Sequence, residues 1–257
     1  MTAKITLVNT GFSVKMWKTA FKSIFNANAV IEGVKSSPSK ELTEAFRKQA
    51  LGEALAVRAM GFFYLVNLFE KVPLALSIDF NNTQNLPSAN PADVYKQIID
   101  DLEEASGYLP EVYEGNNAER IRINKWFVKA MLARVYLYTK NYEQAFRNAD
   151  DVISKTALFQ LEPLSNVFRF DSREVIFQLK QPNISFVRGN ATPEGYSMAG
   201  KYLTPQLVNA FETGDNRKTA GPTRSPDHPR CRRVCLPRST RSTRPTSRWM
   251  VLDRSTM

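Results

Sequence analysis

A run of apolar side chains inside a long helical pattern is the feature that most constrains the fold. The pattern extends from about residue 40 to about residue 70, and in its first half an apolar residue recurs every three or four positions. Its second half, from Ala59 to Phe69, reads AMGFFYLVNLF and is apolar on almost every side, so we expect this helix to be buried among others. The run is 11 residues long, far short of the roughly 20 that a membrane-spanning helix needs.

Further helical patterns lie on both sides of this segment. Ser39 is expected to cap the helix that begins near residue 40, and Pro73 is expected to end it. Residues 74–89 read as a loop, whereas residues 174–179 (EVIFQL) read as a short strand. The other predicted helices cover residues 16–34, a segment after Asn90 with Val94, Ile98, Leu102, Ala105 and Leu109 on its buried face, residues 125–139 after Asn124, residues 142–155 after Asn141, and residues 205–212. The predicted fold class is therefore mainly all-α, with little β structure.

The predicted helices at 125–139 and 142–155 have the spacing of a tetratricopeptide repeat. Leu132, Ala133 and Tyr136 occupy its Leu, small and Tyr positions, and Ala145 and Ala149 follow where the second helix packs on the first. Small residues at such positions allow two antiparallel helices to approach closely. We therefore expect a tetratricopeptide-like helical-repeat scaffold, joined to an irregular loop region over residues 181–203.

The distribution of charge divides the chain after residue 216. Residues 1–216 contain 24 Lys and Arg against 23 Asp and Glu, whereas residues 217–257 contain 11 against 2. The basic segment is also rich in Pro, Ser and Thr and cannot bury enough apolar surface to fold. We expect a helical domain over 1–216 and a disordered tail over 217–257. The abrupt preference for Arg near Ala220 is typical of an out-of-frame read. A basic arm for nucleic acid or for an anionic membrane surface is the alternative, and we expect no nucleic-acid partner.

Several kinds of active site are excluded by the composition of residues 1–216, which contain neither His nor Cys. Histidine bases, cysteine nucleophiles, and metal sites built on imidazole or thiolate ligands are therefore absent from this part of the chain. Its glycines are never spaced as a phosphate-binding loop requires. We expect no cofactor, no metal and no catalytic residues; paired carboxylates and Ser, Lys or Tyr chemistry are the catalytic options that the composition leaves open.

Charged and aromatic residues at helical positions have structural interpretations. Arg58 lies inside the apolar helix, so we expect it to be buried against a carboxylate, either Glu53 or one on a neighbouring helix. The residues Asp100, Asp101, Glu103 and Glu104 are interpreted as a solvated helix face. Core packing is the expected role of three aromatic residues with helical core spacing, Trp17, Trp126 and Tyr136.

A series of short blocks follows in a fixed order along residues 15–220. The blocks are Trp17 with Phe21, Ile24 and Asn28; Gly52–Ala54, Arg58–Ala59, Phe63–Tyr64, Leu68–Phe69 and Val72–Leu74; Val94–Tyr95, Ile98, Asp101–Leu102, Ala105 and Leu109–Pro110; Lys129–Ala130, Leu132–Leu137, Tyr142, Ala145 and Val152–Ile153; and Glu174–Phe177, Phe211–Glu212, Gly214–Asp215 and Arg217. Each block is short, but the ordered set resembles the SusD/RagB family of outer-membrane nutrient-binding lipoproteins.

The resemblance implies a binding protein and not an enzyme. Such a protein sits at the cell surface, captures an oligosaccharide or another oligomeric nutrient, and passes it to a SusC-like TonB-dependent transporter in the outer membrane. Members of the family begin with a signal peptide and a lipid-modified cysteine, and they continue well beyond the block that ends at Arg217. We therefore expect this chain to be a fragment that lacks the leader and the lipid anchor.

Two loops carry the candidate ligand-binding residues. Sites for sugars combine aromatic platforms with Asn, Asp or Arg side chains that bond hydroxyl groups, and loops commonly present them. The resemblance places part of the ligand site after the predicted strand, where the candidates are Phe186, Arg188, Asn190, Tyr196 and Tyr202. The second set of candidates is Phe80, Asn81 and Asn82.

Two other functions stay open. A helical-repeat scaffold also suits an intracellular adaptor that binds a protein segment in a concave groove. A carboxylate-based glycosidase would require two carboxyl groups roughly 5–9.5 Å apart across a cleft.

Overall fold

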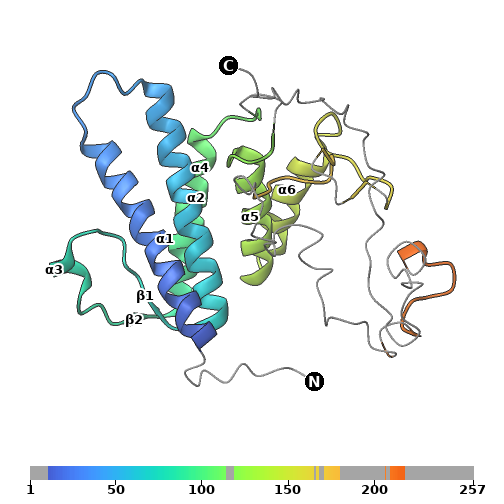
Figure 1. The fold of residues 1–257 in the computed structure, drawn as a ribbon, viewed down its shortest axis with the longest axis horizontal. Coiled ribbons are helices and arrows are strands. Elements are labelled where there is room, and N and C mark those ends of the chain that lie inside the picture. The colour runs from blue at the N-terminus through green and yellow to red at the C-terminus, as the bar shows by residue number, and fades with distance from the viewer. Residues whose placement is uncertain are drawn as a thin grey trace, which may run out of the picture. The chain divides into compact units, whose positions relative to one another are not determined.

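Six helices and two short strands make up the part of the chain that the computed structural model describes: residues 11–113, 119–164, 166–167, 171–179, 206 and 209–217. The strands β1 (Val72–Pro73) and β2 (Ser88–Ala89) pair antiparallel. The predominance of helix confirms the predicted all-α class (Figure 1). The helices are α1 (Gly11–Ser36), α2 (Glu44–Phe69), the single-turn α3 (Phe80–Thr83), α4 (Pro91–Tyr108), α5 (Lys125–Tyr138) and α6 (Tyr142–Ile153).

The chain forms two compact units, and every named element belongs to the first. This unit comprises residues 1–161 and 173–180. The second unit comprises residues 162–172 and 181–257; in its described part Arg217 forms an ion pair of 2.7 Å with Asp215. Residues 205, 207 and 208 of the predicted helix over 205–212 lie outside the described residues; in its described part the amide of Ala210 donates to the carbonyl of Gln206 at 3.0 Å. The domain boundary at residue 216 stays a prediction.

Helix α2 is the centre of the core, as its apolar sequence predicts. It packs against α1 on one side and α4 on another, and α5 then packs on α4 and on α6. By length and composition alone α2 could cross a membrane, but 56% of its most apolar window is buried within the protein. Gly61 permits close packing with α1, because a Cβ atom there would lie 2.9 Å from Ile24. The side chains of α2 that are fully or almost fully buried include Leu55, Phe62 and Leu65.

The start of α2 differs from its prediction. The helix begins at Glu44, and its cap is Thr43, whose hydroxyl accepts a hydrogen bond of 3.2 Å from the amide of Phe46. Ser39 was expected at this position. Instead, the Arg47 guanidinium donates hydrogen bonds to the carbonyls of Ser37 and Ser39, at 3.0 and 2.7 Å, which keeps the preceding turn out of the helix.

The other helix caps largely agree with the sequence analysis. Asn124 and Asn141 accept hydrogen bonds from the amides of Phe127 and Gln144, as expected of N-cap residues. Asn90 occupies the N-cap position of α4, but its side chain forms no capping bond. All five residues of the predicted buried face of α4 are buried: Val94, Ile98, Leu102, Ala105 and Leu109.

The predicted strand over residues 174–179 is wrong. This segment is irregular: side chains bond several of its carbonyls, and the amide of Gln178 donates to the carbonyl of Arg120 at 2.8 Å, but it pairs with no neighbouring strand in the described part of the chain. Arg120 donates to the carbonyls of Arg173 and Val175, and the Tyr113 hydroxyl donates to the carbonyl of Ile176 at 2.9 Å. The apolar residues that suggested a strand serve the core instead, where the ring of Phe177 contacts that of Phe127.

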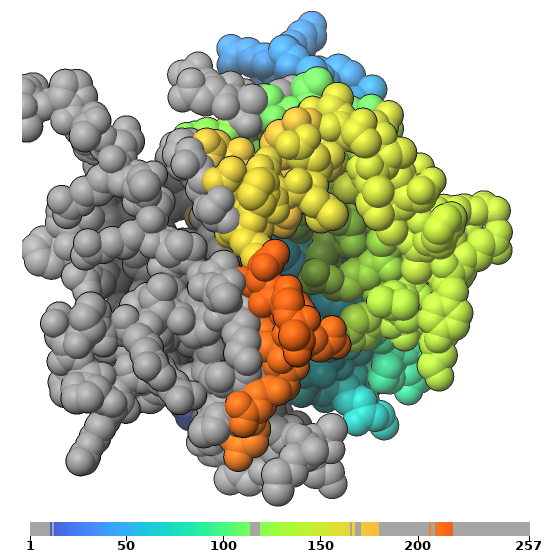
Figure 2. Space-filling model, turned by 90° about the vertical axis from the view of Figure 1, so that its right-hand side faces the viewer, coloured from blue at the N-terminus to red at the C-terminus, as the bar shows by residue number. Residues whose placement is uncertain are grey.

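Helices α5 and α6 form the predicted antiparallel pair. Tyr136 fills the position expected of it and is 8% exposed; its hydroxyl donates a hydrogen bond of 2.7 Å to Glu103 on α4. Burial and the adjoining carboxylate raise the pKa of Tyr136 to about 12. Helix α6, yellow-green, lies at the right of the surface that faces the viewer in Figure 2. Phe146 and Ile153 are each 70% exposed, so α6 keeps an apolar stripe on its outer side.

A strained turn ends α2 and yields a prediction. Glu70 has φ 66° and ψ −70°, and the amide of Lys71 donates to the carbonyl of Phe69 at 2.8 Å, which is the geometry of a strained γ-turn. We expect Glu70→Gly to raise the free energy of unfolding by about 1 kcal/mol, because glycine adopts this conformation without a Cβ clash. Urea denaturation measures the change.

The matched control for this turn is Lys71→Gly. Lys71 has no positive φ, so glycine there relieves no strain. It only increases the conformational entropy of the unfolded chain, which lowers the free energy of unfolding. Equal stabilities of the two variants would contradict the interpretation that Glu70 is strained.

Candidate functional site

A groove with a volume of about 380 Å³ lies between α1 and the segment that leads from β1 to α3. Residues 17, 21, 24, 25 and 28 share one face of α1, because they recur at intervals of three and four. The opposite wall is irregular backbone with small side chains. The lining residues are Trp17, Phe21, Ile24, Phe25 and Asn28 from α1, and Pro73, Ala75, Ser77 and Thr83 from the opposite wall.

The wall formed by α1 is aromatic and partly exposed. The rings of Trp17 and Phe21 have centroids 4.8 Å apart, and Trp17 meets Phe69 edge to face at 5.0 Å. Phe25 is 53% exposed. Aromatic surfaces held this way offer flat apolar area with little loss of side-chain entropy on binding. The groove can therefore take an apolar face of a ligand, such as the C–H face of a sugar ring.

The aromatic face of α1 is the part of the site that sequence reasoning missed. Trp17 was predicted to be a core residue, as were Trp126 and Tyr136. Trp126 and Tyr136 are buried as predicted, at 3% and 8% exposure. Trp17 packs against the core but is half-buried, and its remaining surface lines the groove. Phe25 next to Ile24 was the available signal, since an apolar residue beside a buried stripe widens it beyond what one neighbouring helix covers.

The predicted candidates Phe80, Asn81 and Asn82 lie beside the groove rather than in its lining. They belong to α3, whose cap Asp79 accepts hydrogen bonds from the Asn81 amide at 2.9 Å and from the Asn82 side chain at 3.0 Å. Phe80 is 70% exposed, and Thr83 at the end of the same turn does line the groove. The other candidates lie outside the described residues: Phe186, Arg188, Asn190, Tyr196 and Tyr202.

Two hydrogen bonds hold the outer wall against α1. The Asn28 side chain donates to the carbonyl of Ala75 at 3.0 Å. One helical turn further on, the Glu32 carboxylate accepts a bond of 2.9 Å from the amide of Ile78. The same face of α1 therefore presents aromatic rings to the groove and then binds the segment that closes it.

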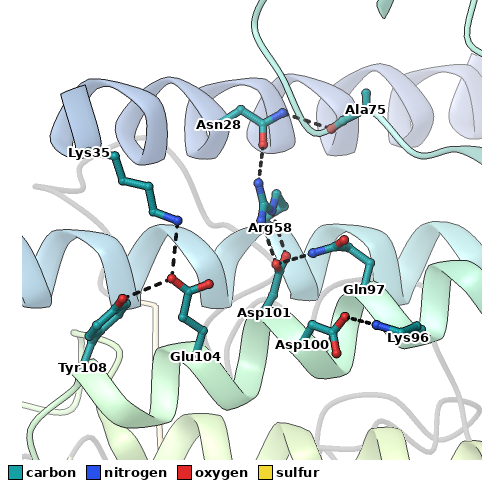
Figure 3. A network of polar contacts seen from close by, with 10 residues as sticks. All are labelled: Asn28, Lys35, Arg58, Ala75, Lys96, Gln97, Asp100, Asp101, Glu104 and Tyr108. Atoms are coloured by element: carbon teal, nitrogen blue, oxygen red, sulfur yellow. Dashed lines mark hydrogen bonds and ion pairs between the residues drawn. The ribbon is translucent and has the colours of Figure 1, made fainter.

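Beneath the groove, Arg58 joins three helices in a buried polar network (Figure 3). Its guanidinium forms two bonds with Asp101 on α4, at 2.7 and 2.8 Å, and a third bond of 3.0 Å with the Asn28 side-chain oxygen on α1. Gln97 also donates to Asp101, at 2.7 Å. The expectation of a carboxylate partner from a neighbouring helix is confirmed, while Glu53 pairs with Arg122 instead.

The predicted solvated face of α4 is wrong for one of its four acidic residues. Asp101 is 1% exposed, because it is the partner of Arg58. Asp100 and Glu104 do face solvent, where they pair with Lys96 and Lys35. Within the described ranges, no three His, Cys, Asp or Glu side chains are grouped so that they could hold a metal ion.

Comparison with known proteins identifies the family to which the chain belongs. Residues 2–137 match the SusD-like family described as starch-binding and associating with the outer membrane. A SusD-like protein of Bacteroides ovatus is 26% identical over 171 residues, which are 60% of this chain and 30% of that protein. The chain spans about a third of the length of the curated relatives that it matches.

Solved structures agree in fold. A SusD superfamily protein from Bacteroides thetaiotaomicron is 26% identical with a TM-score of 0.58, over 63% of this chain and 38% of that one. A laminarin-binding SusD-like protein is 28% identical with a TM-score of 0.56, over 62% of this chain and 36% of that one. The helical scaffold described above is thus shared with a protein that binds laminarin.

Proposed function

The chain belongs to the SusD-like family of outer-membrane-associated glycan-binding proteins, and from that premise we propose that it captures an oligosaccharide at the cell surface. The observation that carries the proposal is the family match over residues 2–137. It is supported by the likeness to a laminarin-binding protein. We further propose that the recipient is a SusC-like TonB-dependent transporter, that the protein performs no catalysis, and that the whole protein is a surface lipoprotein.

The groove supplies the chemistry that this function requires. The C–H face of a sugar ring would stack on Phe25 and on the Trp17–Phe21 pair, while the hydroxyls of Ser77 and Thr83 would bond the ring's own hydroxyl groups. Phe80 would extend the platform from α3. The residues Phe186, Arg188, Asn190, Tyr196 and Tyr202 remain proposed contacts of the same ligand.

Calorimetric titration with laminarin oligosaccharides tests the proposal. We expect saturable binding to the intact chain and a loss of about tenfold in affinity on Phe25→Ala, because a stacked ring contributes on the order of 1 kcal/mol beyond its buried area. Phe46→Ala is the matched control, since Phe46 is 56% exposed on α2 and does not line the groove. We expect it to bind as the unmodified protein does.

Other outcomes would identify the alternatives. If starch, laminarin and xyloglucan oligosaccharides all fail to bind and a peptide binds in the groove, the chain acts as a protein-binding adaptor. Turnover of a chromogenic glycoside that is lost on replacing one carboxylate would indicate a glycosidase.

A further inference from the structure

The orientation of the Asn28 side-chain amide is fixed by its partners. Asn28 is 1% exposed and bonds in two directions. A guanidinium has only donors, so Arg58 must meet the amide oxygen, and it does so at 3.0 Å. The amide nitrogen is then left to face the opposite way, where it donates to the carbonyl of Ala75 at 3.0 Å.

Arg58 is itself held in place by a second helix. Both of its bonds with Asp101 are shorter than 3 Å, at 2.7 and 2.8 Å, and both side chains are almost entirely buried, at 9% and 2% exposure. A bidentate pair of this kind defines both the position and the plane of the guanidinium. The chain of hydrogen bonds therefore runs from α4 through α2 and α1 to the wall of the groove (Figure 3).

We propose that Asn28 is a positioning residue for the ligand groove. It fixes the Ala75 carbonyl, and with it the wall from Pro73 to Ser77, at a set distance from the aromatic face of α1. The wall carries the proposed hydroxyl partner Ser77, so its position determines whether a ring stacked on α1 also reaches a hydrogen bond. This role rests on the proposed glycan binding, although the placement of the wall can be measured without a ligand.

The hydrogen bond of Glu32 also holds the wall, but it is more exposed to solvent than that of Asn28. Glu32 lies four residues after Asn28 and accepts from the Ile78 amide at 2.9 Å, near the exposed end of the same segment. Water replaces this outer contact readily, whereas the inner contact is less accessible to water, because Asn28 in the groove lining is only 1% exposed. The inner contact is therefore the one expected to hold the wall.

Asn28→Asp removes the donor of the inner contact and keeps the shape of the side chain, although it adds a charge next to Arg58. One carboxylate oxygen still accepts from Arg58, but the other cannot donate to the Ala75 carbonyl and repels it. We expect the Ile78 amide to exchange with solvent about tenfold faster, and laminarin oligosaccharides to bind about tenfold more weakly, as the loss of one buried hydrogen bond predicts. Amides in the middle of α2 should keep their slow exchange, which separates a loosened wall from general unfolding.

Two further variants complete the test. Glu32→Gln keeps an acceptor for Ile78 and should leave both readouts within about twofold of the unmodified protein. If Asn28→Asp does not fold, Asn28→Ala replaces it, since it removes the same donor without adding a charge.

The possible results distinguish the positioning role from the proposed function. Unchanged Ile78 exchange in a folded Asn28 variant would overturn the role of Asn28, as would a loosened wall with unchanged affinity. If the unmodified protein binds no oligosaccharide, the proposed glycan binding fails, and the exchange measurement alone decides whether Asn28 positions the wall.

Discussion

Replacing Asp101 with alanine is expected to lower the free energy of unfolding by about 3–5 kcal/mol. The substitution leaves the Arg58 guanidinium, whose side chain is 9% exposed, buried without a counter-charge. Removing one partner of a buried ion pair costs far more than the pair contributes over an apolar replacement, because the remaining charge keeps its desolvation penalty. Equilibrium denaturation in urea, followed by circular dichroism, measures the loss.

The neighbouring residue provides the control. Asp100 pairs with Lys96 four positions away, but its side chain is 49% exposed and that of Lys96 is 75% exposed. Asp100→Ala should change the unfolding free energy by no more than about 0.5 kcal/mol, as is usual for surface pairs. Similar losses for the two variants would show that Asp101 has no special place in the core.

A second large effect is expected from Phe62→Ala, at about 3–5 kcal/mol. Phe62 is fully buried in the second half of α2, the helix that packs against both α1 and α4. Truncating it removes the transfer free energy of a benzyl group and leaves a cavity that three long helices cannot easily close. The same urea titration is expected to show a lower midpoint with little change in slope.

Phe46→Ala tests whether burial, rather than the aromatic ring, causes this effect. Both residues lie on α2, but Phe46 is 56% exposed in the first turn. Its replacement should cost less than about 1 kcal/mol. A loss as large as that of Phe62→Ala would mean that the packing around α2 differs from the one described.

The helices could be predicted because a period of 3.6 residues is a local property of the sequence. The burial of Asp101 could also have been predicted from the sequence. Residues 94, 98, 101 and 105 follow one another at intervals of four, three and four, so Asp101 lies on the apolar stripe of α4 rather than opposite it. An isolated buried arginine on α2 and a carboxylate on such a stripe are complementary, and pairing them would have given the correct ion pair.

The groove could not be predicted, for physical reasons. Its outer wall has no regular structure, and its path depends on the bonds of Ala75 to Asn28 and of Ile78 to Glu32, which join residues 46 or 47 positions apart. The prediction of a strand at 174–179 was wrong for the same reason, because it depends on distant contacts: a strand forms only where a partner strand is available. Five predicted contacts of the proposed oligosaccharide stay predictions: Phe186, Arg188, Asn190, Tyr196 and Tyr202.

The order in which the helices pack has a consequence for how the protein folds. Helix α2 contacts α1 and α4, α4 contacts α5, and α5 contacts α6, so each layer touches mainly its nearest neighbours along the chain. Loop closure between such neighbours is short and costs little entropy, which is typical of rapidly folding domains of low contact order. Stability is then expected to accumulate layer by layer, as in linear repeat proteins. Among the described helices α1 packs mainly on α2 and α6 mainly on α5, so these two outer layers are expected to open before α2 and α4 do.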